Sequence, residues 1–174
     1  MADWTIQTPV LGLQPIAETS TVKKVPLGTI VTAVHQSSTG STSYGSGEFI
    51  YLKGLDSTAV GSWVHYNLDD GSTTLAVANG IGPVAVAMSA CLTGEFGWYQ
   101  ISGKAIGKCL SGYADNGAVY LTSTDGSIDD QAVAGDLVHL AKGASAIGTP
   151  SAGLAEFEIS RPFTDDNVDD LDVS

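Results

Sequence analysis

Residues 154–160, with the sequence LAEFEIS, carry the clearest structural pattern in the chain. Apolar and polar side chains alternate along them, so that Ala155, Phe157 and Ile159 are set between Glu156, Glu158 and Ser160. Successive side chains of a β-strand point to opposite faces of a sheet. The alternation therefore predicts a strand whose apolar face is turned toward a core.

Similar short segments follow one another along most of the sequence, separated by turn residues. Further strands are predicted at 27–35, 47–53, 60–68, 72–78, 83–90, 96–102, 104–110, 117–123 and 136–142. Turn dipeptides such as Asp70-Gly71 and Asn116-Gly117 favour tight hairpins, and no helix of three turns is predicted. Strands spaced by about 8–12 residues indicate an all-β domain, either a β-barrel or a β-sandwich.

The two ends of the chain differ from this central domain, which we place at residues 27–160. Residues 1–26 hold three of the six prolines and predict an extended N-terminal arm, because proline fixes φ and removes a hydrogen-bond donor. The arm packs either on its own domain or on a neighbour. Residues 161–174 contain five aspartates and predict a solvated acidic tail, anchored to the core by Phe163.

The composition fits one folded domain and excludes several partners. The chain has 174 residues, of which 21 are glycine and 15% are charged, whereas charged residues usually make up about 25% of a globular domain. Seven lysines and arginines against nineteen aspartates and glutamates give a formal net charge of −12. This acidity predicts no binding to nucleic acid or to an anionic membrane, since both need a basic surface. Neither a membrane span nor a secretory signal is expected.

The residue types that usually carry catalysis are few and scattered. His35, His65 and His139 each lie in a predicted strand, without the spacing of a zinc site. Cys91 and Cys109 are predicted to be reduced, half-buried thiols, because two cysteines in such a chain make no disulfide framework. No nucleophile motif or phosphate-binding loop occurs. The sequence predicts a protein that is not an enzyme, with no cofactor.

Two loops leave calcium binding open as an alternative. The first contains Asp125, Asp129 and Asp130, and the second contains Asp69 and Asp70. Clustered carboxylates suit a hard cation, but neither loop has the EF-hand spacing. Asp-Gly turns explain both loops equally well, so no metal ligand is assigned.

Aromatic residues in the predicted strands allow two interpretations. Packing in a core is the favoured one. The alternative is an exposed platform that binds a glycan or a protein partner. The residues concerned are Tyr51, Trp63, Tyr66, Trp98, Tyr99 and Tyr120.

Four segments carry a resemblance to known proteins: 47–54 (GEFIYLKG), 60–67 (VGSWVHYN), 81–90 (IGPVAVAMSA) and 94–105 (GEFGWYQISGKA). The most distinctive stretch is G-x-x-G-W-Y-Q-x-x-G in the last of them, and the likeness extends through residues 122–136 and 149–163. Together they resemble the small acidic proteins encoded beside the major capsid protein in tailed bacteriophages.

The resemblance implies a head decoration, or cement, protein. Such a structural protein binds the outer surface of the capsid and stabilises it by bridging subunits of the major capsid protein. The implied location is the exterior of the virion, after synthesis in the host cytoplasm. The implied partners are the major capsid protein and neighbouring copies of the chain, with a homotrimer favoured over a homodimer. Known cement proteins include tulip-like barrels, jelly rolls and immunoglobulin-like domains, and the sequence selects none of these folds.

We expect the N-terminal arm to supply contacts to the capsid or to a neighbouring copy. The arm can add a strand to the edge of another subunit's sheet. Its candidate contact residues are Trp4, Ile6, Val10, Leu11, Leu13, Lys23 and Lys24. The alternative function is a carbohydrate- or receptor-binding module on the virion surface, which would use exposed aromatic residues and the aspartate-bearing loops.

Overall fold

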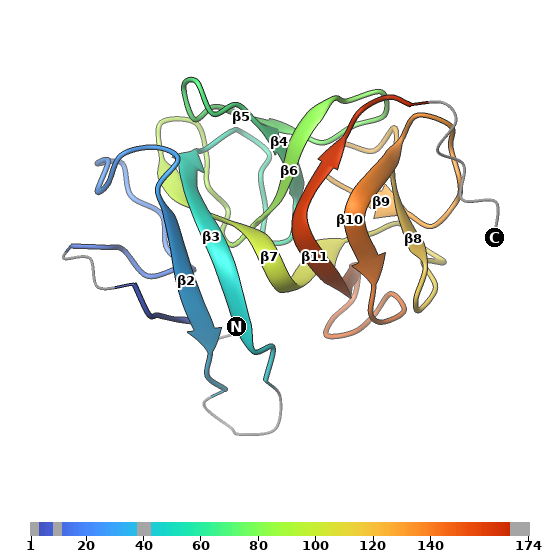
Figure 1. The fold of residues 1–174 in the computed structure, drawn as a ribbon, viewed down its shortest axis with the longest axis horizontal. Coiled ribbons are helices and arrows are strands. Elements are labelled where there is room, and N and C mark those ends of the chain that lie inside the picture. Colours follow the sequence, from blue (N-terminus) through green and yellow to red (C-terminus); the bar gives the residue numbers. More distant parts are fainter. Residues whose placement is uncertain (1–3, 9–11, 38–42, 168–174) are drawn as a thin grey trace.

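A computed structural model describes residues 4–8, 12–37 and 43–167 of the chain. The described residues form eleven β-strands and no helix, joined in a single antiparallel sheet (Figure 1), which confirms the predicted all-β class. None of the described segments is a helix with the length and apolar character that a membrane crossing requires. In chain order the strands are β1 (Trp4–Ile6), β2 (Ile30–His35), β3 (Ser46–Lys53), β4 (Trp63–Tyr66), β5 (Thr73–Leu75), β6 (Gly82–Ala87), β7 (Phe96–Lys108), β8 (Ala118–Leu121), β9 (Ile128–Asp129), β10 (Leu137–Gly143) and β11 (Leu154–Thr164).

The longest strand, β7, joins the other strands into one sheet. Across the sheet the order is β1-β2-β3-β7-β6-β11-β10-β8-β9, with β4 paired to β6 and β5 paired to β4. The first half of β7 pairs with β3 and β6, and its second half pairs with β11. In Figure 1, β7 accordingly crosses the molecule between the β2–β3 side and the β10–β11 side.

The sequence pattern divided this region into two strands, at 96–102 and 104–110, but β7 is continuous from Phe96 to Lys108. Gly103, which suggested a break, stays in the ladder opposite Ile159. Its φ is +96°, and a Cβ built there would lie 2.5 Å from the carbonyl oxygen of Ser46. Glycine is therefore required by the close approach of β3, and it does not end the strand.

Buried apolar side chains form three clusters along the sheet. The first and largest cluster lies among β4, β6, β8, β10, β11 and the second half of β7, where Trp63 meets Phe157 edge to face at 5.1 Å between ring centroids. The second lies among β3, β4, β6 and the first half of β7. The third, which contains Phe49, Tyr51 and Trp98, is covered by residues of the N-terminal segment.

The alternating segment 154–160 forms most of β11, as predicted. Ala155, Phe157 and Ile159 are at most 4% exposed and belong to the first cluster, whereas Glu158 is exposed. Glu156 is the exception, because it is buried although it lies on the polar face. Its carboxylate is covered by Lys104 of the neighbouring strand, at 2.6 Å from the ammonium nitrogen.

Strand β11 continues to Thr164 and so includes the first four residues of the predicted tail, 161–164. Contacts on both sides explain the extension. The Phe163 ring stacks on His139 of β10 at 4.8 Å, and the Thr164 hydroxyl donates a hydrogen bond to the Gly80 carbonyl at 2.7 Å. The acidic stretch of the described chain begins at Asp165.

The N-terminal segment, residues 12–29, lies on its own domain. Ile16 is 1% exposed in the third cluster. The Gln14 side chain accepts a hydrogen bond from the Tyr51 hydroxyl at 3.0 Å, and the Gln14 carbonyl accepts one from the Trp98 indole at 3.1 Å. Ser20 forms a β-bridge with Phe96 at the start of β7. The segment therefore completes the core of its own chain.

We expect Ile16→Ala to lower the free energy of unfolding by about 2–5 kcal/mol, the usual cost of truncating a buried isoleucine. Val22→Ala is the matched control: Val22 lies six positions further along the same segment but is 62% exposed. This control should change stability by less than about 0.5 kcal/mol. Urea unfolding followed by tryptophan fluorescence measures both, and equal small effects would show that the segment is not part of the core.

Candidate functional site

The predicted contact residues of the N-terminal arm divide into two groups in the structure. Trp4, Ile6 and Leu13 are partly buried and pack on the third cluster, with the Trp4 ring 4.9 Å from that of Phe49. Their apolar faces are thus partly used within the chain. Two others, Val10 and Leu11, lie outside the described residues.

The remaining two, Lys23 and Lys24, are exposed together with Val22. Two anchors hold this short stretch: the Ser20 hydroxyl accepts a hydrogen bond from the Val22 amide at 3.1 Å, and the Tyr51 hydroxyl accepts one from the Lys24 amide at 3.3 Å. Neither lysine forms an ion pair within the described chain. We call residues 21–24 the basic loop, which offers one apolar and two cationic side chains to a partner.

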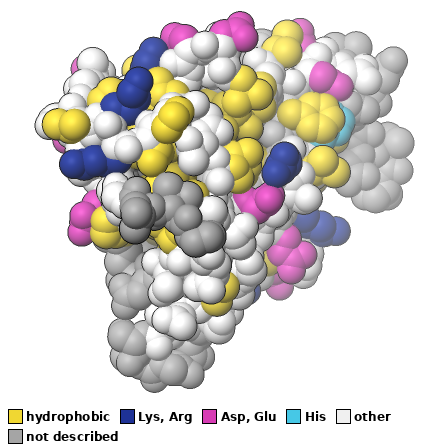
Figure 2. All heavy atoms as spheres, turned by 60° about the vertical axis from the view of Figure 1, so that its left-hand side comes forward, with side chains coloured by type: hydrophobic (Ala, Val, Ile, Leu, Met, Phe, Trp, Pro, Cys, Tyr) yellow, Lys and Arg dark blue, Asp and Glu magenta, His cyan; other side chains and the backbone are white. Residues whose placement is uncertain are grey.

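Figure 2 shows how apolar and charged side chains are distributed over one face of the molecule. Hydrophobic side chains and several Lys or Arg side chains are interspersed over its upper part, whereas uncharged polar groups and backbone dominate the lower part. Charges of both signs lie among the apolar atoms of this face. This surface suits contact with a protein better than binding to a highly charged polymer.

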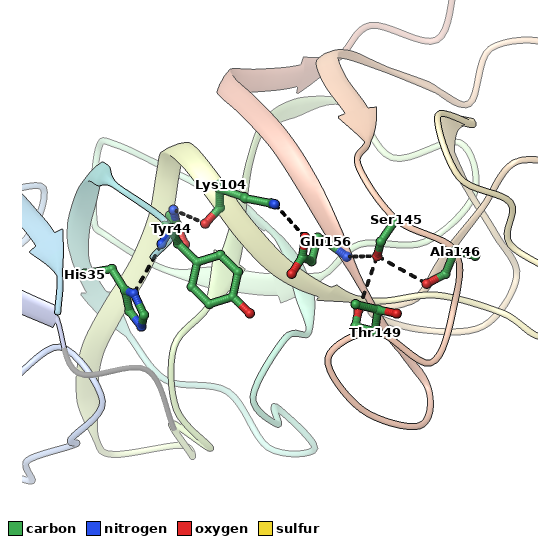
Figure 3. A network of polar contacts seen from close by, with 8 residues as sticks. His35, Tyr44, Lys104, Ser145, Ala146, Thr149 and Glu156 are labelled. Atoms are coloured by element: carbon green, nitrogen blue, oxygen red, sulfur yellow. Dashed lines mark hydrogen bonds and ion pairs between the residues drawn. The ribbon is translucent and has the colours of Figure 1, made fainter. Parts of the chain in front are cut away.

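A polar network occupies the surface between the β2–β3 hairpin and β11 (Figure 3). Its centre is the ion pair of Lys104 and Glu156, and the Lys104 nitrogen lies 5.7 Å from the centre of the Tyr44 ring. Burial and the Glu156 carboxylate raise the pKa of Tyr44. The Tyr44 amide donates to Nδ1 of His35 at 3.2 Å.

Ser145 extends the same network toward β10 but is not an activated nucleophile. Its hydroxyl oxygen accepts a hydrogen bond from the Glu156 amide at 2.9 Å. Carbonyl groups of Ala146 and Thr149 lie within hydrogen-bond distance as acceptors for its proton. A serine nucleophile needs a base as the acceptor of that proton, and here carbonyls fill the position. The network fixes the geometry of loops and neutralises a buried carboxylate.

The three histidines lie in different places and make different contacts. His35 packs beside Trp4 and Tyr44, and His139 stacks on Phe163 with its Nε2 atom 3.3 Å from the Asp165 carboxylate. His65 is buried, with Nε2 at 2.8 Å from the Thr164 hydroxyl. Because that hydroxyl already donates to Gly80, His65 must donate to it through Nε2–H.

Both cysteines are free and buried, Cys109 in the first cluster and Cys91 in the second. Burial raises the pKa of each thiol to about 11. At neutral pH both are therefore protonated, and a protonated thiol is a poor nucleophile.

Aspartates in both candidate calcium loops accept hydrogen bonds from backbone amides of the chain. Asp130 accepts from the Ala114 amide at 2.8 Å, and Asp70 accepts from the Ser72 amide at 3.0 Å and pairs with Lys53. Burial, and the nearby charge of Asp130, raise the pKa of Asp129. In residues 4–8, 12–37 and 43–167, no three His, Cys, Asp or Glu side chains converge to hold a metal ion.

Five of the six strand aromatics predicted to pack in the core do so, since Tyr51, Trp63, Trp98, Tyr99 and Tyr120 are at most 1% exposed. Tyr66 is partly exposed. These residues therefore do not form the exposed platform that the glycan-binding alternative required.

A surface that the sequence did not indicate lies where β6, β10 and β11 meet. Ile81, Leu140 and Phe163 are 66%, 60% and 38% exposed, and we call these three residues the distal patch. Ile81 precedes a strand, and Leu140 falls in a regular strand pattern, so neither position stands out in the sequence. Phe163 was expected only to anchor the tail.

Comparisons with known proteins leave the family open: no family model, no curated protein and no solved structure matches this chain.

The buried histidine makes stability depend on pH. Burial lowers the pKa of His65 below its ordinary value of 6.5. As pH falls through the ordinary value, the unfolded chain takes up a proton that the folded chain excludes, so the free energy of unfolding decreases. We expect a smaller decrease for His65→Gln between about pH 7.5 and about pH 5.5, where histidine changes charge. Urea unfolding at several pH values measures it, and identical pH profiles would contradict the prediction.

The ion pair of Lys104 and Glu156 makes a second prediction. Lys104→Met should destabilise the protein by about 2–4 kcal/mol, because it leaves a buried carboxylate without its partner. The double variant Lys104→Met/Glu156→Leu should recover most of the loss, since an apolar pair of similar volume removes the uncompensated charge. Thermal unfolding of the wild type, the two single variants Lys104→Met and Glu156→Leu, and the double variant completes this double-mutant cycle. Additive losses in the double variant would show that the two side chains are not coupled.

Proposed function

We propose that this chain is a head decoration protein of a tailed bacteriophage, a structural protein that binds the exterior of the capsid and bridges subunits of the major capsid protein. The resemblance of residues 94–105 carries the proposal. Residues 96–105 of that stretch form most of β7 and therefore lie at the centre of the fold, where Trp98 and Tyr99 contribute to two clusters. The proposed partners are the major capsid protein and further copies of this chain, in preference as a homotrimer.

We further propose that the sheet closes into a barrel and is not an open sandwich. Ile128 of β9, at one end of the strand order, forms a parallel bridge with Cys109, and its carbonyl accepts a hydrogen bond from the Leu110 amide at 2.8 Å. Residues 109–110 directly follow β7, so strands β7, β11, β10, β8 and β9 enclose the first cluster. Closure leaves these five strands without a free edge among them, which protects them from edge-to-edge aggregation.

In this proposal the N-terminal residues contact the capsid through β1 and the chain before Gly12. β1 is the first strand in the order and has a neighbour only on its β2 side within the described sheet. A strand of another protein can pair with such an edge. The side chains of Trp4 and Ile6 then fix β1 on its own domain and leave its backbone to the partner.

The carbohydrate- or receptor-binding alternative has less support. It required an aromatic surface with converging polar groups. Five of the six strand aromatics are instead buried. Asp130 and Asp70 of the candidate loops already accept hydrogen bonds from the amides of Ala114 and Ser72.

Co-sedimentation with undecorated, mature-form capsids of the parent phage tests the proposal. We expect saturable binding at a fixed ratio to the capsid subunit and a shell that withstands higher temperature. Lack of binding at every salt concentration and maturation state would remove the capsid role. A glycan array would then test the alternative.

A shortened chain tests the role of β1. Removal of residues 1–8 deletes β1 but keeps Gln14 and Ile16 in the core, so the domain should fold and bind capsids with lower occupancy. Removal of residues 1–24 would also delete these core residues and confuse binding with unfolding. Full occupancy by the shorter deletion would assign the capsid contact to another surface.

A further inference from the structure

The distal patch is an apolar surface held on three strands. Phe163 lies opposite Pro83 of β6 and opposite His139 of β10. Ile81 lies two residues before Pro83, and Leu140 directly follows His139. The three apolar side chains are well exposed. In Figure 1 the end of β11 that carries the patch lies at the upper right of the molecule. Exposed apolar residues that gather in one place commonly mark a contact site.

Backbone strain accompanies this exposure. Leu140 has a φ of +59°, in the left-handed region that a leucine rarely adopts. It lies at the register shift between His139 and Ala141, and Arg161 of the facing strand has a φ of +52°. Leu140 gains little packing in return, since most of its side chain is in solvent. Strain of this kind persists at sites where a side chain must be presented to a partner.

The rim of the distal patch is acidic. Asp165 and Asp166 follow the end of β11, and Asp166 lies beside Gly135. Asp165 contacts His139, and neither carboxylate pairs with a lysine or arginine among the described residues. A complementary partner therefore has an apolar side chain next to positive charges.

The basic loop of the same chain has this composition. Val22 is 62% exposed beside Lys23 and Lys24, and the loop is fixed by the hydrogen bonds of Ser20 and Tyr51. In Figure 1 the segment around residue 20 lies on the left of the molecule, whereas β11 lies on the right of β2, β3 and β6. The loop cannot reach the patch within one chain. A second copy can supply it.

We propose that copies of this chain associate head to tail, with the basic loop of one copy seated on the distal patch of the next. Val22 covers the apolar surface of Ile81, Leu140 and Phe163, and the two lysines face Asp165 and Asp166. A contact between two different surfaces forms a ring when its rotation closes. The inference does not rest on capsid binding, because it concerns only the chain in solution.

Sedimentation equilibrium over a range of protein concentrations tests this contact. The wild type should form oligomers, and Lys23→Glu/Lys24→Glu should raise the dissociation constant about tenfold or more, because it places like charges in contact. A charge-matched control, Lys108→Glu/Ser151→Glu/Ala152→Glu, changes the net charge equally away from both surfaces. A wild type that stays monomeric up to about 1 mM, a concentration that detects even weak contacts, would overturn the proposal. An equal effect of the control would also overturn it.

Charge exchange identifies the two surfaces. Asp165→Lys/Asp166→Lys should weaken association as strongly as the lysine reversal does. An equimolar mixture of the two reversed variants should associate again, since the acidic loop of one meets the basic rim of the other. Failure of the mixture to associate, with both variants folded by circular dichroism, would show that the loop and the patch do not meet.

Leu140→Asn tests the strained position without a change of charge. Asparagine adopts a left-handed backbone more readily than leucine, so the variant should keep or raise the melting temperature. It should nevertheless raise the dissociation constant, because the patch loses an apolar side chain. Unchanged association in this stable variant would exclude the distal patch as the contact.

Discussion

The pairing of β7 along both edges is the constraint on which the rest of the structure depends. β3 occupies one edge, whereas β6 and then β11 occupy the other. At the change from β6 to β11, the buried Gln100 side chain donates hydrogen bonds to the carbonyls of Ser102 and Lys104. The amide thus adds two hydrogen bonds to the backbone of β7 beside this change of partner. All three clusters are built against β7 or its pairing partners.

Patterns of two-residue period were sufficient for much of this fold. The alternation at 154–160 identified the inner face of β11. The strand predicted at 83–90 contains most of β6, whose residues 84–87 are at most 1% exposed. Both patterns report burial, which is a local property of each side chain. Glu156 broke the pattern because its burial depends on Lys104, a partner in another strand. Gly103 was read as a gap between two strands because its true cause, the close approach of the β3 backbone, is not visible in the sequence.

Contacts between distant segments explain why the candidate sites were harder to predict. The prolines predicted an extended path for the N-terminal segment, but composition does not say which surface such a path follows. The surface is determined by Gln14, whose hydrogen bonds with Tyr51 and Trp98 join residues that are 37 and 84 positions apart in the sequence. The exposure of Leu140 is set by the register between β10 and β11. A sequence pattern holds no record of that register.

The distribution of cations limits where an acidic chain can meet another copy of itself. At a net charge of −12, two copies repel each other over distances up to the Debye length, about 8 Å at physiological salt. Contact between two copies is then favoured where one of them has a region of positive local charge. Lys53, Lys104 and Arg161 are already paired with carboxylates of their own chain. Lys23 and Lys24 are the only two cationic residues that are neighbours in the sequence, and an acidic surface complements them.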